Sequence, residues 1–127
     1  MSGKLLILLV FCALPSVCRA QDNEQGPVFN GIQLRDDCHM VEMDDTRLSD
    51  QEEVRRTVCE YYVLGVYDGF RSGDDEYKIC VPQNVNVREM ALVVSKYLYQ
   101  HPERLHDPVP HLVIDALYQT FPCSSTQ

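Results

Sequence analysis

The sequence predicts an all-α protein, a small bundle of about four helices arranged as two hairpins and held by two disulfides. Helix-start signals recur along the chain, and each opens a run in which apolar residues repeat at helical spacing. No segment shows the sustained apolar and polar alternation of a half-buried strand. With 127 residues, 45% of them hydrophobic and 24% charged, the chain has the size and composition of one globular domain.

The first half of the chain contains two predicted helices. Asn30 stands three residues before Gln33, as in a capping box, and opens a first helix over residues 32–43. Ser49 stands in the same relation to Glu52 and opens the second helix. The residues predicted to form the buried face of that second helix are Val54, Val58, Tyr61, Tyr62, Gly65, Val66, Gly69 and Phe70.

Two further helices are predicted in the second half. Asn86 with Glu89 forms the third start signal. Asp107 is the predicted N-cap of the fourth helix, with Pro108 at the first helical position, where its missing N–H costs nothing. The apolar residues at helical spacing are Met90, Ala91, Val94, Tyr97 and Leu98 in the third helix, and Val109, Leu112, Val113, Ala116, Leu117 and Phe121 in the fourth.

The N-terminus has the three-part plan of a secretory signal peptide. Lys4 precedes the apolar run Leu5–Leu14, and a small residue, Ala20, ends the segment. We expect cleavage after Ala20, which separates a signal peptide over residues 1–20 from a single helical domain over residues 21–127. The apolar run is too short to span a bilayer, so we expect no stable membrane anchor.

The net charge of −8, from 11 Lys plus Arg against 19 Asp plus Glu, argues against a nucleic-acid partner. Such partners need clustered cations to neutralise phosphate, and the same holds for anionic lipid. Removal of the signal peptide takes away two further positive charges.

Four cysteines remain after cleavage, and an even number in an oxidising compartment indicates two disulfides. Turns near residues 44–48 and 101–107 would create two helical hairpins joined by a longer connection, 72–84. Antiparallel helices bring together residues that are equidistant from their turn. This geometry favours the pairs Cys38–Cys59 and Cys80–Cys123, whose midpoints fall close to the two turns.

Catalysis and metal binding have little support in the sequence. Four oxidised cysteines leave no thiolate nucleophile, and no HExxH, GxSxG or phosphate-binding glycine loop is present. His101, His106 and His111 recur every five residues, so on a helix they would not converge on one metal, and turn or capping roles are expected. We expect neither a metal nor another cofactor.

Two features have structural interpretations. The motif Gly65-x-x-x-Gly69 is predicted to accommodate a neighbouring helix of the same chain, with a dimer seam as the alternative. The tyrosines predicted to lie in the core or at its boundary are Tyr61, Tyr62, Tyr97, Tyr99 and Tyr118.

Several motifs occur in a characteristic order. They are Asn30-Gly31 before Cys38, Cys59-Glu60-Tyr61-Tyr62 with Gly65 and Gly69, Cys80-Val81-Pro82, Lys96-Tyr97-Leu98, His101-Pro102-Glu103 with Leu105-His106, Leu112 to Leu117, and Phe121-Pro122-Cys123. This set, which covers most of residues 30–123, resembles the Rap/Tai family of type VI secretion immunity proteins. The weakly apolar first helix and the polar insert over residues 73–78 depart from the family pattern.

The resemblance implies a periplasmic helical protein, commonly a homodimer. Such a protein binds a toxin delivered by neighbouring or sister cells. In the amidase branch of the family, the toxin is a peptidoglycan peptidase and the immunity protein occludes its active-site cleft. Inhibition of this kind needs surface complementarity and no chemistry by the inhibitor.

The acidic loop that contains Asp74, Asp75, Glu76 and Tyr77 is a candidate toxin-binding plug. Its carboxylates would steer it towards a basic cleft rim, and Tyr77 would be the buried anchor. The alternative is a solvated linker whose charges only keep it in water.

Other exported helical proteins fit the same features. A periplasmic acid-stress chaperone would also be small, helical and disulfide-bonded, and so would a eukaryotic secreted helical factor. A chaperone should dissociate and expose apolar surface at low pH, whereas an immunity protein should form a stoichiometric complex with one toxin.

Overall fold

The computed structural model describes residues 29–73 and 78–123, and within these ranges it contains four α-helices and no strand. The helices are α1 (Gly31–Cys38), α2 (Asp50–Arg71), α3 (Val87–Gln100) and α4 (Val109–Thr120). Short 3₁₀ turns occupy His39–Glu42, Asp45–Arg47 and Pro102–Arg104. The all-α prediction is therefore confirmed, although the first helix ends at Cys38 and continues to Glu42 only as a 3₁₀ turn.

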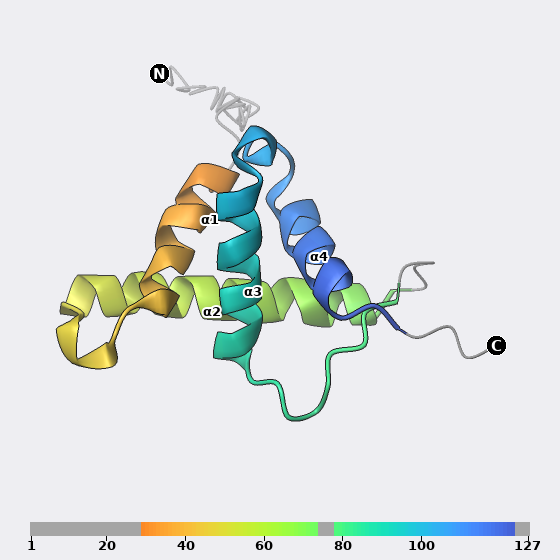
Figure 1. The fold of residues 1–127 in the computed structure, drawn as a ribbon, viewed down its shortest axis with the longest axis horizontal. Coiled ribbons are helices and arrows are strands. Elements are labelled where there is room, and N and C mark those ends of the chain that lie inside the picture. Colours follow the sequence, from red (N-terminus) through yellow and green to blue (C-terminus); the bar gives the residue numbers. More distant parts are fainter. Residues whose placement is uncertain (1–28, 74–77, 124–127) are drawn as a thin grey trace, which may run out of the picture.

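The longest helix, α2, runs across the other three (Figure 1). Helices α1, α3 and α4 lie side by side, with α3 in the middle, and each of them also contacts α2. Helices α3 and α4 run in opposite directions, as the second predicted hairpin requires. The crossing of α2 over the layer means that α2 supplies one face to the core of the protein.

The core lies between α2 and this layer of three helices. Leu34 of α1, Val63 of α2 and Leu112 of α4 are fully buried in it. One polar side chain, Ser95 of α3, is also fully buried, and its hydroxyl donates to Glu42 Oε1 at 2.7 Å. The other apolar side chains with 1% exposure or less are Cys38, Val41, Cys59, Ala91, Val94, Leu98, Val113, Ala116 and Leu117.

Three of the four predicted helix starts are confirmed. The Asn30 side chain accepts from the backbone N–H of Gln33 at 3.0 Å. Complete capping boxes open α2 at Ser49 and α3 at Asn86, because each cap side chain accepts from the N–H three residues on while a glutamate returns to the cap N–H. Each bond satisfies an amide that has no partner within the helix.

The predicted N-cap at Asp107 is wrong. Helix α4 begins one residue later, with Pro108 as its N-cap and Pro110 within its first turn. The Asp107 carboxylate instead accepts from Arg104 Nε at 2.8 Å, an ion pair inside the α3–α4 turn. A local ion pair with Arg104 therefore takes the place of the predicted capping bond.

Both predicted disulfides are present. Cys38–Cys59 joins the end of α1 to the middle of α2, with a Cα–Cα distance of 5.1 Å, and both side chains are fully buried. Cys80–Cys123 joins the segment before α3 to the segment after α4, with a Cα–Cα distance of 4.9 Å. Beside it, Ile79 and Pro122 form an isolated antiparallel bridge, so the ends of the α3–α4 hairpin are held together.

Exposure predicts the order in which the two disulfides are reduced. Cys80 is exposed, whereas both partners of Cys38–Cys59 are fully buried. Because exchange needs access to a sulfur atom, limiting reductant should open Cys80–Cys123 first. Alkylation followed by peptide mapping should label Cys80 and Cys123 before the other pair, and simultaneous labelling of all four would contradict this order.

Gly31 allows the start of α1 to pack closely against the α3–α4 turn. A Cβ at this position would lie 2.5 Å from the Leu105 carbonyl oxygen and 2.8 Å from Leu112 Cδ1. Gly31→Ala should therefore lower the free energy of unfolding by roughly 1–3 kcal/mol, the usual cost of overpacking. Urea denaturation followed by circular dichroism would measure it. The matched control Gln33→Ala, at an exposed position of the same helix, should stay within about 0.5 kcal/mol of the parent.

Candidate interaction surface

The predicted plug, Asp74, Asp75, Glu76 and Tyr77, lies outside the described residues. Its two attachment points are described. On the α2 side, Gly73 N donates to Phe70 O at 3.1 Å. On the α3 side, Cys80 N donates to Phe121 O at 2.9 Å, beside the disulfide to Cys123. The loop is therefore attached to the helical body at both ends.

A groove lies next to these attachment points, between the C-terminal half of α2 and the segment 81–87. Tyr67 and Met90 contribute buried apolar surface to it. Asp68 and Arg71 stand at its edge, and the Arg71 guanidinium lies 5.4 Å from the centroid of the Tyr67 ring. The region combines apolar surface with one charge of each sign, the usual chemistry of a protein-binding rim.

The outer face of α2 is a second candidate surface. Val54, Val58 and Tyr61 are 62%, 42% and 65% exposed, although the sequence pattern placed them on the buried face of this helix. The buried residues of α2 are Cys59, Val63 and Tyr67. The prediction is wrong for the exposed three because α2 has apolar residues on two sides, and the other helices cover only one of them.

Tyr61 and Tyr62 show how these two sides differ. Tyr62 packs beneath Phe29, with ring centroids 4.8 Å apart, and burial raises the pKa of its hydroxyl. Tyr61 projects from the outer face. Of the five tyrosines predicted for the core or its boundary, Tyr97 is buried and Tyr62 is half-buried, whereas Tyr61, Tyr99 and Tyr118 are exposed.

The two glycines of α2 do not accommodate a helix of the same chain. Among residues 29–73 and 78–123, a Cβ built at Gly65 or at Gly69 would meet nothing within 4 Å. The prediction of an intramolecular contact at this motif is therefore wrong. Both glycines are exposed on the same face as Val58 and Tyr61.

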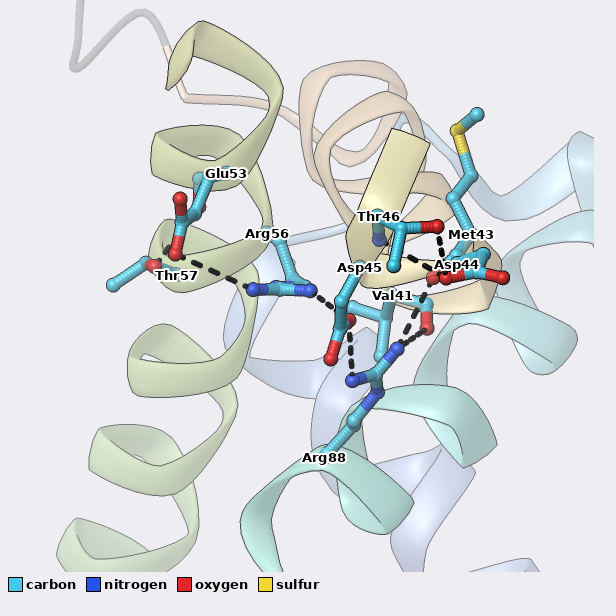
Figure 2. Close-up of polar contacts among 9 residues, drawn as sticks. All are labelled: Val41, Met43, Asp44, Asp45, Thr46, Glu53, Arg56, Thr57 and Arg88. Carbon is cyan, nitrogen blue, oxygen red and sulfur yellow. Dashed lines mark hydrogen bonds and ion pairs between the residues drawn. The ribbon is translucent and has the colours of Figure 1, made fainter. Parts of the chain in front are cut away.

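A group of ion pairs fixes the turn between α1 and α2. Asp45 in this turn accepts from Arg56 of α2 and, at 2.8 Å, from Arg88 of α3 (Figure 2). Arg88 also donates to the carbonyl oxygens of Val41 and Met43, at 3.2 and 3.1 Å. One carboxylate thus ties the turn to two helices, and the hydrogen bond from Arg88 lowers the pKa of Asp45 below its ordinary value.

A second group of ion pairs fixes the turn between α3 and α4. Arg104 donates to the Tyr97 hydroxyl and lies 2.8 Å from carboxylate oxygens of both Asp107 and Asp115. The hydrogen bonds to Asp115 and Asp107 raise the pKa of the guanidinium above its ordinary value, while burial raises the pKa of the Tyr97 hydroxyl. Both turns at the ends of the helices are therefore held by charged contacts.

Within the described ranges, no group of three or more His, Cys, Asp or Glu side chains is placed to hold a metal ion. His101 caps the end of α3, in line with the predicted turn role, and its Nδ1 lies 3.1 Å from Glu103. The four cysteines of the described ranges are paired. In the same part of the chain, no helix has the length and apolar character needed to cross a bilayer.

Asp45 should contribute a stability that depends on pH. Because its pKa is lowered in the folded state, its contribution is present above about pH 4, the ordinary range of a carboxyl, and is lost as the pH falls through the folded pKa. Asp45→Asn should therefore lower the urea midpoint at pH 7, and this difference should close towards pH 2.5.

The matched control for this change is Asp68→Asn. The Asp68 carboxylate makes no hydrogen bond or ion pair to the described residues. The Asp68→Asn substitution should therefore change the urea midpoint only slightly at pH 7. If the urea midpoints of the parent and of Asp45→Asn differ by the same amount at pH 7 and at pH 2.5, the role given to the Asp45 carboxylate is contradicted.

Comparison with known proteins agrees with the resemblance carried by the motifs. No curated protein and no solved structure matches the chain. The family described as Rap1a immunity proteins matches residues 30–123, which include all four helices and both disulfides. The chain belongs to the Rap1a immunity protein family.

Proposed function

We propose that this protein is exported to the periplasm, binds a type VI secretion amidase there and blocks its active-site cleft. The observation that carries the proposal is the family match across the whole helical body. Membership indicates immunity against a type VI effector. The periplasm is the compartment in which a peptidoglycan amidase acts, and the signal peptide over residues 1–20, cleaved after Ala20, would deliver the protein to it.

The paired cysteines support this location. Disulfides persist in oxidising compartments such as the periplasm and are rare in the cytosol. Cys38–Cys59 and Cys80–Cys123 are both within bonding distance. An inhibitor in the periplasm must stay folded until a toxin arrives. Disulfides stabilise such a small fold.

Inhibition in this proposal requires no reaction by the protein itself. A rigid surface that fills the cleft of the toxin excludes the peptidoglycan substrate. The loop over residues 74–77 is the proposed plug, and its attachment at Gly73 and Cys80 lowers the ordering cost that a free loop would pay on binding. We further propose that the active form is a homodimer, as the family resemblance implies.

Protection of cells tests the function and the compartment together. Bacteria that express a type VI peptidoglycan amidase in the periplasm should survive when the full-length chain is co-expressed. A chain that lacks residues 1–20 should stay in the cytosol and fail to protect, although it reaches the same level. Lysis in the presence of exported protein, across a panel of such amidases, would contradict an amidase as the target.

The plug has a direct binding test. Replacing Asp74, Asp75 and Tyr77 with alanine should weaken the affinity for the amidase against which the chain protects by about tenfold or more. The reason is that a few anchor residues dominate the binding energy of an interface. Calorimetry with the purified amidase would measure the dissociation constant. An unchanged value would eliminate the plug while leaving the immunity function standing.

A control variant uses the same kinds of side chain elsewhere. Asp36 of α1, Tyr99 of α3 and Glu103 of the turn after α3 are two acids and an exposed tyrosine. Their replacement with alanine should change the dissociation constant less than twofold. Loss of affinity in this variant alone would move the toxin-binding surface to α1 and α3.

A further inference from the structure

The outer face of α2 carries a continuous row of apolar and glycine residues that no other element of the described ranges covers. Val54, Val58, Tyr61, Gly65 and Gly69 follow one another at helical spacing and share one side of the helix. The three side chains are 62%, 42% and 65% exposed, and both glycines face open space. Single exposed apolar residues are ordinary, whereas an unbroken row along a helix marks an interaction surface.

The row is complementary to itself when a second copy lies antiparallel to it. With a two-fold axis between Tyr61 and Tyr62, Val58 of each copy lies level with Gly65 of the other, and Val54 lies level with Gly69. The bulky side chains of one helix therefore meet the empty positions of its partner. The two Tyr61 rings fall beside the axis, where they can pack against each other. Such a contact is isologous, as a closed dimer requires.

The charged residues near the two ends of α2 also favour the antiparallel register. The N-terminal half of the outer face is acidic, with Asp50 and Glu53, whereas the C-terminal end carries one charge of each sign, Asp68 and Arg71. The antiparallel arrangement brings Arg71 of each copy within about one residue of the level of Glu53 in the other. A parallel pairing would instead place each of these charges opposite the same charge of the other copy, so the antiparallel orientation is favoured.

We propose that this face of α2 is the seam of a symmetric homodimer, with Val58 and Tyr61 of each copy packed against Gly65 and Tyr61 of the other. The inference rests on the dimer included in the proposed function and assigns its surface, orientation and register. The self-complementary row favours a second copy over a different protein, which would have no need of matched bulky and empty positions. The residues assigned to the seam do not include any of the proposed plug.

Oligomeric state tests the surface. Sedimentation equilibrium of the mature chain, without any toxin, should show a dimer. Val58→Glu should raise the dissociation constant of that dimer about a hundredfold, because each contact is made twice and two carboxylates enter an apolar seam. Gly65→Leu should have a similar effect by filling the space that receives Val58. Both monomers should keep the circular dichroism spectrum of the parent, since neither position contacts the core.

The matched control is Leu92→Glu, the same kind of change at an exposed apolar position of α3. This variant should remain dimeric. A monomeric parent would overturn the proposal, as would a dimer that Leu92→Glu dissociates and Val58→Glu does not. Protection against the amidase is measured separately, so a parent chain that is monomeric and still protects cells would reject the seam and leave the immunity function standing.

Cysteine cross-linking tests the register. Tyr61→Cys should form an intermolecular disulfide with itself under mild oxidation, because the two positions lie beside the axis. Val58→Cys alone should not, since its two copies lie roughly 10 Å apart along the helices, beyond the reach of a disulfide. A mixture of Val58→Cys and Gly65→Cys should cross-link. Efficient self-linking of Val58→Cys would indicate a parallel seam and overturn the proposal.

Discussion

The fold depends on one constraint, which is that a single long helix packs against three others on one side only. Helix α2 contacts α1, α3 and α4, and its buried side chains, Cys59, Val63 and Tyr67, all face that layer. Helices α1 and α4 are short and gain most of their stability from this burial. The same arrangement leaves the opposite side of α2 without cover from the other described helices, so the core and the exposed apolar row have one structural origin.

Covalent and ionic contacts hold the layer in place at its margins. Cys38–Cys59 fixes α1 where it meets α2, while Cys80–Cys123 closes the ends of the α3–α4 hairpin. Asp45 and Arg104 hold the two turns through several charged partners each. The part of the chain that the structure describes is thus a cross-linked scaffold whose described surfaces are positioned by fixed elements, which suits a protein that acts by shape complementarity.

The helices were predicted well from short sequence patterns, because the hydrogen bonds that start a helix join residues close together in the sequence. Capping bonds at Asn30, Ser49 and Asn86 span three residues, and the structure contains all of them. The cap at Asp107 is the exception, because Arg104, which is also three residues away, competes for the same carboxylate. The first helix tightened into a 3₁₀ turn after Cys38, at the point where the disulfide joins α1 to α2.

By itself, the sequence determined the all-α class, the four helices, the cysteine pairing and the family, since spacing along the chain records each of these. The tertiary structure decided which side of α2 is buried. Val54, Val58 and Tyr61 are as apolar as the residues of the core, and helical periodicity cannot distinguish two apolar sides of one helix. The placement of α1, α3 and α4 on a single side of α2 shows which of its two apolar sides meets solvent. Burial depends on neighbours that are distant in the chain, so periodicity does not record it.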